Sequence, residues 1–192
     1  MKAWPRTALL LILILIPGSL SLGSLPSIPH PLSTSQLLGK WFEIAATPQS
    51  YQKQCRSNST LELFELPNED LKVLNTCVQF NEEKLVAEGR GKVMNRRDSS
   101  TLSITYVRFF DWVHFLGTEF DVLNFDKNEN YMIVGNPDKK IGWILSRDEE
   151  LSLPDLKHIS QILQQHKLDP CRFFIQPQSR GLSERTSICE LF

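Results

Sequence analysis

Short segments that alternate between apolar and polar residues constrain the fold of this chain more than any other feature. Eight of them, separated by polar or Gly/Pro-containing turns, lie at residues 41–45, 60–65, 71–74, 85–93, 101–107, 120–125, 131–134 and 141–145. Such segments are typical of half-buried strands joined as hairpins. Eight antiparallel strands can close on themselves so that no edge remains. The sequence therefore predicts an all-β chain that folds as an eight-stranded antiparallel up-and-down barrel.

Glycines and one helical segment add detail to this prediction. Gly89 and Gly91 interrupt the fourth segment and predict a bend or bulge there. After the strands, Ser152 is a candidate N-cap, and apolar residues recur at helical spacing from Leu156 onward. We expect a helix from about Pro154 to Lys167, with its apolar stripe packed outside the barrel, and a short final strand at 171–175.

The first residues of the chain have the pattern of an export signal. Lys2 and Arg6 precede a nine-residue apolar run, which is far shorter than the roughly 20 residues needed to span a bilayer as a helix. Small residues favour cleavage after Gly23. We therefore divide the chain into a signal peptide (1–23), an extended leader (24–36), one folded domain (37–176) and a C-terminal tail (177–192) tied by a disulfide. The alternative for the first segment is a membrane anchor.

Composition excludes several classes of function. The chain has 21 basic and 22 acidic residues and no basic cluster, so we expect no nucleic-acid partner. The four histidines lack ligand spacing and there is no C-x-x-C, so no metal and no cofactor are expected. Aromatic residues are dense between residues 106 and 143. They either fill a core or line a pocket, and their number favours a hollow barrel.

The four cysteines, Cys55, Cys77, Cys171 and Cys189, are an even number in a chain predicted to be exported. This favours two disulfides over free buried thiols, and three pairings are open. Counting outward from the turn at residues 68–69 places Cys77 opposite about residue 60. A Cys55–Cys77 bond would therefore need a bulge or a twist.

Three motifs carry a family resemblance. The segment Gly39-Lys40-Trp41-Phe42-Glu43-Ile44-Ala45 resembles the G-x-W-[YF]-E-[IV]-A opening of the lipocalins. Residues 126–134 resemble the hairpin between the sixth and seventh strands of that family, and residues 143–147 resemble its W-I-L-[SA]-R motif. In this order, the three motifs make the chain similar to lipocalins, above all to bacterial outer-membrane lipocalins and apolipoprotein D. The resemblance implies a calyx with one C-terminal helix packed outside.

The resemblance also implies roles for individual residues. Gly39, Trp41 and Arg147 would close the barrel base, with the guanidinium over the indole. Alternation from the base would then turn Glu43, Ala45, Trp143 and Leu145 inward. We expect the ligand cavity to be lined by Glu43, Ala45, Asn75, Tyr106, Phe110, Phe120, Trp143 and Leu145. A ligand head group would stay at the open end, near residues 111–114.

Two disulfide patterns exist among the similar proteins. Some exported bacterial relatives imply Cys55–Cys77 together with Cys171–Cys189. The pattern of apolipoprotein D would instead join Cys55 to Cys189 and Cys77 to Cys171, and we favour the first pattern. The chain lacks the cysteine after the signal that bacterial lipoproteins use as an anchor, so we expect periplasmic or extracellular protein without a lipid anchor.

The expected function is binding, and carriage or storage, of a small hydrophobic or amphipathic ligand such as a fatty acid or lysophospholipid. No catalytic arrangement is apparent, so the chain is expected not to be an enzyme. One alternative is an isomerase-type enzyme that needs a free thiol, for which Cys77 is the candidate. Another is a protein that binds partners through its loops. Trp112, Phe115 and Leu116 would either cap the barrel mouth or make a peripheral membrane contact. Oligomeric state is left open.

Overall fold

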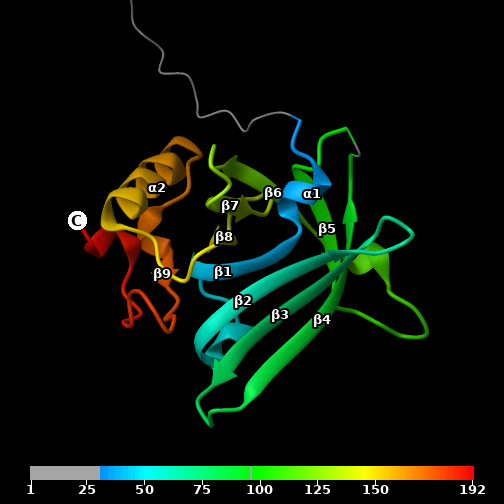
Figure 1. Ribbon diagram of the computed structural model, residues 1–192, viewed down its shortest axis with the longest axis horizontal. Coiled ribbons are helices and arrows are strands. Elements are labelled where there is room, and N and C mark those ends of the chain that lie inside the picture. The colour runs from blue at the N-terminus through cyan, green and yellow to red at the C-terminus, as the bar shows by residue number, and fades with distance from the viewer. Residues whose placement is uncertain (1–30, 96) are drawn as a thin grey trace, which may run out of the picture.

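The computed structural model describes residues 31–95 and 97–192. The predicted signal peptide and residues 24–30 of the leader lie outside this part. The main strands are β1 (Gly39–Ala46), β2 (Cys55–Glu65), β3 (Leu71–Gln79), β4 (Lys84–Val93), β5 (Thr101–Thr105), β6 (Thr118–Phe125), β7 (Tyr131–Gly135) and β8 (Gly142–Ser146). All neighbours pair antiparallel in chain order, and β1 pairs with both β8 and β2. The predicted eight-stranded closed barrel is therefore confirmed (Figure 1).

Helices and a ninth strand complete the chain. Helix α2 (Leu153–Gln165) begins at Ser152, whose side chain caps the Asp155 N–H at 3.2 Å, as predicted. Figure 1 shows α2 beside the barrel, next to β9 (Phe174–Ile175), which pairs with β1. Single turns are α1 (Thr34–Leu37), η1 (Tyr51–Gln54), η2 (His114–Leu116), η3 (Pro170–Arg172) and η4 (Ile188–Glu190). No helix among the described residues is long and apolar enough to cross a membrane.

The leader departs from the extended conformation expected up to residue 36. Residues 34–37 form the α1 turn instead, because Ser33 and Gln36 make a capping box. Leu32 and Leu37 on either side of it are buried in the barrel core. Because these two leucines are buried, the α1 turn between them lies across the closed end of the barrel. The turn is therefore part of the folded domain.

Two apolar clusters hold the fold together. One fills the lower half of the barrel and consists of Leu32, Leu37, Trp41, Leu63, Leu71, Val73, Leu102, Val122, Phe125, Met132 and Leu145. The other lies outside the barrel wall under α2 and includes Ile44, Ala45, Tyr131, Ile133, Ile144, Leu156, Ile159, Ile162, Leu163, Phe173 and Ile175. The helix packs its apolar stripe on the outer face, as its spacing predicts.

The register shifts of the strands do not lie at Gly89 and Gly91. A bend or a bulge was predicted at Gly89 and Gly91, and the β3–β4 ladder, which runs without a register shift, excludes the bulge. Packing explains the glycine at position 89 instead, because a Cβ there would lie 2.8 Å from the ring of Tyr106. Register shifts occur in β1 between Glu43 and Ala45, in β6, and twice in β2.

The shifts in β2 allow the first disulfide. Thr60 pairs with Thr76, close to what hairpin counting predicts, and two shifts between Thr60 and Cys55 then bring Cys55 to Cys77. Their Cα atoms are 5.6 Å apart. Cys171 bonds to Cys189, so the structure has the pairing of the exported bacterial relatives and not the Cys55–Cys189 alternative.

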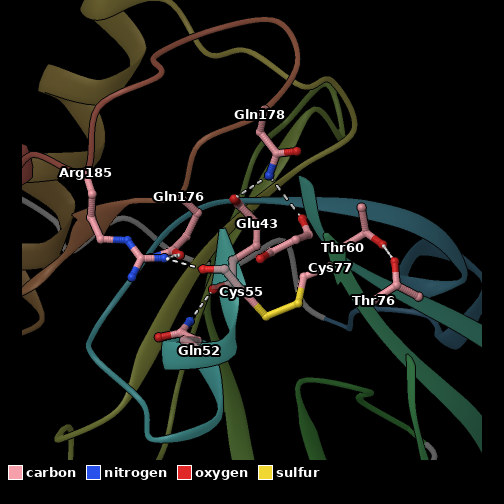
Figure 2. Close-up of a disulfide and its surroundings, with 10 residues drawn as sticks. Glu43, Gln52, Cys55, Thr60, Thr76, Cys77, Gln176, Gln178 and Arg185 are labelled. Atoms are coloured by element: carbon pink, nitrogen blue, oxygen red, sulfur yellow. Dashed lines mark hydrogen bonds between the residues drawn. A yellow bond between two sulfur atoms is a disulfide. The ribbon is translucent and has the colours of Figure 1, made fainter. Parts of the chain in front are cut away.

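The C-terminal segment fills a gap between β1 and β2. These strands pair only from Gly39 to Phe42 on β1. Beyond that point the Gln178 side chain donates to the carbonyls of Glu43 (2.9 Å) and Ser59 (3.0 Å), and so bridges the two strands (Figure 2). The Asn58 N–H donates to the carbonyl of Pro177 at 2.8 Å. The segment after β9 therefore seals the seam of the barrel.

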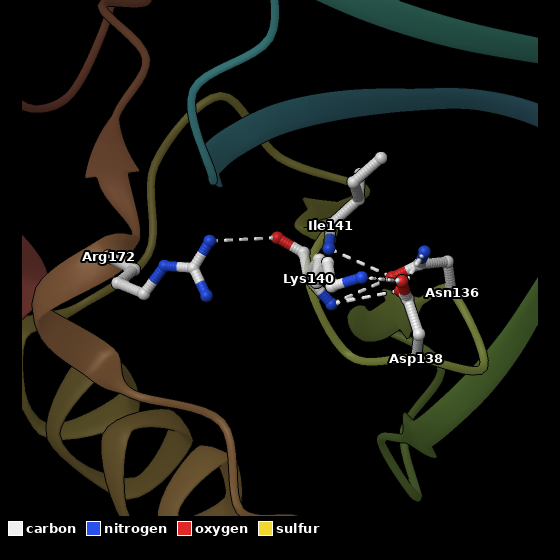
Figure 3. A network of polar contacts seen from close by, with 5 residues as sticks. All are labelled: Asn136, Asp138, Lys140, Ile141 and Arg172. Atoms are coloured by element: carbon white, nitrogen blue, oxygen red, sulfur yellow. Dashed lines mark hydrogen bonds and ion pairs between the residues drawn. The ribbon is translucent and has the colours of Figure 1, made fainter.

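A turn at the open end is fixed by η3, which lies between α2 and β9. In the β7–β8 turn, the Asn136 side chain accepts from the N–H groups of Lys140 (3.0 Å) and Ile141 (2.8 Å). Arg172 donates to the carbonyl of Lys140 at 3.2 Å (Figure 3). The region that follows α2 thus braces the barrel rim as well as its seam.

Candidate functional site

The closed end of the barrel is a packed floor. Trp41 is fully buried, and its indole N–H donates to the carbonyl of Leu37 at 2.9 Å. The guanidinium of Arg147 lies 3.5 Å from the centre of the indole and donates to the carbonyls of Lys40 (3.0 Å) and Gln36 (2.9 Å). Gly39 has a φ of +86°, which favours glycine. The floor blocks passage through this end.

Above the floor, the inward-facing positions follow from the strand register. Glu43 pairs with Leu145, and Ala46 pairs with Trp143, so these residues share the inner face with Trp41. Higher on the opposite walls, the same face carries Asn75, Ala87, Phe120 and, just beyond β5, Tyr106. Phe120 meets Trp143 edge-to-face, with ring centres 5.3 Å apart.

These upper side chains keep accessible surface although they face inward. Asn75, Phe120 and Trp143 are half-buried, and Tyr106 is 48% exposed. Desolvation by burial nevertheless raises the pKa of Tyr106 to about 12, against a lowering by its hydrogen bond from Asn75. These side chains are therefore less closely packed than the floor below.

Glu43 is the one strongly buried carboxylate on this inner face, with 7% of its surface exposed. Gln52, which η1 places over the barrel, donates its side-chain amide to the carboxylate (Figure 2). Burial raises the pKa of Glu43 to about 7, and the Gln52 hydrogen bond and the charge of Arg185 only partly oppose this. Glu43 therefore changes its charge near neutral pH.

Tyr51 joins the same group of side chains from η1. Its hydroxyl interacts with the side chain of Trp143 and with the charge of Glu43. Burial is the main reason that the pKa of Tyr51 is raised, and the charge of Glu43 raises it further. Neither Tyr51 nor Gln52 was predicted as a site residue. They lie in the connection after β1, and no periodic signal marks a connection that turns back into the barrel.

Three predicted cavity residues do not belong to the accessible upper part of the inner face. Ala45 packs in the outer cluster under α2, because the register shift after Glu43 reverses the alternation. Leu145 faces inward but is buried within the packed floor cluster. Phe110 is 91% exposed at the tip of the β5–β6 connection and does not line the barrel interior.

The β5–β6 connection does not cover the mouth of the barrel. This differs from the expectation that residues 111–114 lie at the open end. The Trp112 indole lies against Arg90 on the outer face of β4, at 5.0 Å. His114 reaches to within 3.8 Å of the carboxylate of Asp70, which is in the β2–β3 turn at the closed end. The connection folds back along the outside because β5 ends early, at Thr105 (Figure 1).

A separate hollow of about 470 Å³ lies on the surface near the floor. Its lining is mainly polar and charged: Thr34, Glu65, Asn68, Glu69, Asp70, Lys92 and Val93. Such a lining suits water better than an apolar molecule. The upper half of the barrel, in contrast, has partly accessible aromatic rings on its inner face.

Comparisons with known proteins agree with this architecture. The family model described as the lipocalin-like domain matches residues 32–178, more than half of the chain. Temperature-induced lipocalin-1 of Arabidopsis thaliana is 24% identical over 153 residues, covering 77% of this chain and 80% of that protein.

Solved structures show the same fold. The cockroach major allergen Per a 4 superposes with a TM-score of 0.59 at 16% identity, over 80% of this chain and 92% of that one. Insecticyanin from the tobacco hornworm Manduca sexta gives a TM-score of 0.59 at 21% identity, over 86% and 96%. The closed barrel, its tryptophan–arginine floor and the family match together show that the chain belongs to the lipocalin family.

Proposed function

We propose that this lipocalin binds and carries a small hydrophobic or amphipathic molecule, such as a fatty acid or lysophospholipid, in the upper half of its barrel. The supporting observation is the contrast along the inner face. The floor is packed, whereas Phe120, Trp143 and Tyr106 keep accessible surface above it. Each CH₂ group buried there would contribute about 0.8 kcal/mol, against the entropic cost of binding. We also propose an exported protein, since both disulfides favour an oxidising compartment.

Displacement of a neutral fluorescent probe tests this proposal. N-phenyl-1-naphthylamine is expected to bind the purified protein and to be displaced by fatty acids and lysophospholipids. Trp143→Ala should weaken probe binding several-fold, because it removes the inner wall next to Phe120. Trp112→Ala is the matched control, since this indole lies on the outer face. Equal probe binding by both variants, or none by the wild type, would contradict the proposed site.

The alternative function, an isomerase-type enzyme, would need a free thiol at Cys77 as its nucleophile. Cys77 is bonded to Cys55, and none of the four cysteines is free. The members of this family are typically binding proteins rather than enzymes.

A peripheral membrane contact is a second candidate function because of one exposed cluster. Phe109 and Phe110 are 80% and 91% exposed at the tip of the β5–β6 connection, and Phe115 is 87% exposed nearby. Aromatic side chains in such a tip can enter the interface of a bilayer. Flotation with phosphatidylcholine vesicles tests this: the wild type should float with them and Phe109→Ser/Phe110→Ser should not. A wild type that stays with the soluble fraction would exclude the contact.

A further inference from the structure

Glu43 is an unusual group to find inside a barrel proposed to hold an apolar molecule. It lies just above the floor, on the inner face, with its carboxylate almost removed from solvent. Among the described residues, no lysine, arginine or histidine forms an ion pair with it. Its side-chain partner is the neutral amide of Gln52. A buried carboxylate with no cation beside it is costly to keep charged.

The charge of Arg185 acts on Glu43, but its guanidinium donates hydrogen bonds to other groups. Arg185 donates to the side-chain oxygen of Gln176 at 2.9 Å and to the carbonyl of Cys55 at 3.5 Å (Figure 2). The other groups that face Glu43 are neutral near pH 7: Tyr51 and Gln52 from η1, Tyr106 beyond β5, and Leu145 on β8. Glu43 therefore forms no ion pair among the described residues, and the charge of Arg185 offsets its burial only in part.

Aromatic rings near this carboxylate are the second feature that favours a particular class of ligand. Tyr51 and Tyr106 are close enough for the charge of Glu43 to raise their pKa values, and Trp143 interacts with Tyr51. Phe120 packs edge-to-face on Trp143. Aromatic faces next to an anion attract a cation, because the ring quadrupole and the carboxylate act on it with the same sign. Glu43 has lost its hydration during folding, so a ligand meets a prearranged partner.

We propose that the ligand is an amphiphile with a cationic amine head, which enters the barrel head first and pairs with Glu43 among these aromatic rings. This rests on the proposed function, since it assigns the ligand class of the same cavity. A fatty acid would be disfavoured with its carboxylate in this position and could bind only with its head toward the mouth. A neutral alcohol would be intermediate, because it can donate one hydrogen bond to the carboxylate.

Three ligands that share one tail test the head-group preference. Decylamine, decanol and decanoate each compete with N-phenyl-1-naphthylamine for the purified protein, below their micellar concentrations. At about pH 8.5, where Glu43 is ionised, decylamine is expected to bind about tenfold more tightly than decanoate. At about pH 6 the preference should shrink to a few-fold, since Glu43 is then mostly protonated. This pH comparison needs no substitution.

Two matched variants test whether Glu43 is the origin of the preference for the amine head group. Glu43→Gln keeps the size and polarity of the side chain and should abolish the preference for decylamine while retaining decanol binding. Glu119→Gln removes an exposed carboxylate on the outer face of β6 and should leave the preference unchanged. Circular dichroism checks that both variants are folded.

The outcomes separate the two proposals. If all three compounds bind equally, or if Glu43→Gln keeps the preference, the cationic head group is excluded while the binding function stands. If none of the three displaces the probe, both proposals fail. Tighter binding of decanoate than of decylamine at about pH 8.5 would also overturn the inference.

Discussion

The two halves of this barrel are built from the same strands but are filled in opposite ways. The closed half has a continuous apolar cluster against a tryptophan–arginine floor, and the register between β1 and β2 is regular there. The open half has register shifts, a buried carboxylate and partly accessible aromatic rings, and it relies on η1 and the C-terminal segment for closure. We therefore expect the closed half to contribute most of the stability and the open half to carry the proposed ligand selectivity.

The largest expected effect comes from comparing one inward tryptophan in each half. Trp41→Ala removes a fully buried indole and should lower the free energy of unfolding by about 3–5 kcal/mol. Trp143→Ala should cost less than about 2 kcal/mol, because that side chain is only half-buried. Urea denaturation followed by circular dichroism measures both. Equal losses would show that the two halves are packed alike.

Glu43 makes the open half sensitive to pH in a defined direction. Below its ordinary pKa of 4.5 it is protonated in both the folded and the unfolded chain. Between there and its folded pKa of about 7, the unfolded chain releases the proton while the folded chain retains it. The contribution of Glu43 to the free energy of unfolding therefore falls as the pH rises, by up to about 3 kcal/mol above pH 7.

Glu43→Gln should remove this pH dependence. The variant is expected to be more stable than the wild type at about pH 8, and the difference should disappear below about pH 4.5. Denaturation midpoints of the two proteins, measured across this pH range, give the comparison, with Glu119→Gln as the control for loss of an exposed charge. A constant difference at every pH would mean that Glu43 does not titrate in the way its burial requires.

Sequence alone could predict the regular half of the molecule well. Period-two alternation works wherever pairing is unbroken, so Trp41, Trp143 and Leu145 face inward as expected. The floor contact between Trp41 and Arg147 followed from the family motifs, not from alternation. The barrel, the outer helix and its cap were also predictable, because each rests on local spacing.

The open half was harder to predict from the sequence, because its geometry depends on irregular backbone. One register shift sends Ala45 to the outer face, and alternation cannot foresee it. Tyr51 and Gln52 enter the site from a connection, whose path has no periodic signal. Phe110 was expected inside on the strength of aromatic density, yet the early end of β5 carries it out. The bulges that place Cys55 beside Cys77 are likewise set by tertiary contacts.

Arg147→Met is a smaller test of the floor. The methionine keeps apolar contact with the indole but loses the cation–π contact and the hydrogen bonds to the carbonyls of Gln36 and Lys40. We expect a loss of about 1–2 kcal/mol in the free energy of unfolding, with ligand affinity unchanged. The same denaturation and probe-displacement measurements apply. A change in affinity without a change in stability would place Arg147 in the binding site rather than in the floor.

The smallest effect is expected outside both halves, at the exposed tip of the β5–β6 connection. Phe110→Ser should change the free energy of unfolding by less than about 0.5 kcal/mol, because the ring is 91% exposed and packs edge-to-face only on its neighbour Phe109. Probe binding should also stay unchanged, since the connection folds along the outer wall toward Asp70. A several-fold loss of probe affinity would mean that this connection swings over the mouth when ligand binds. The boundary of the open half would then extend beyond the strands to a mobile cover, and the contrast between the two ends would depend on the ligand.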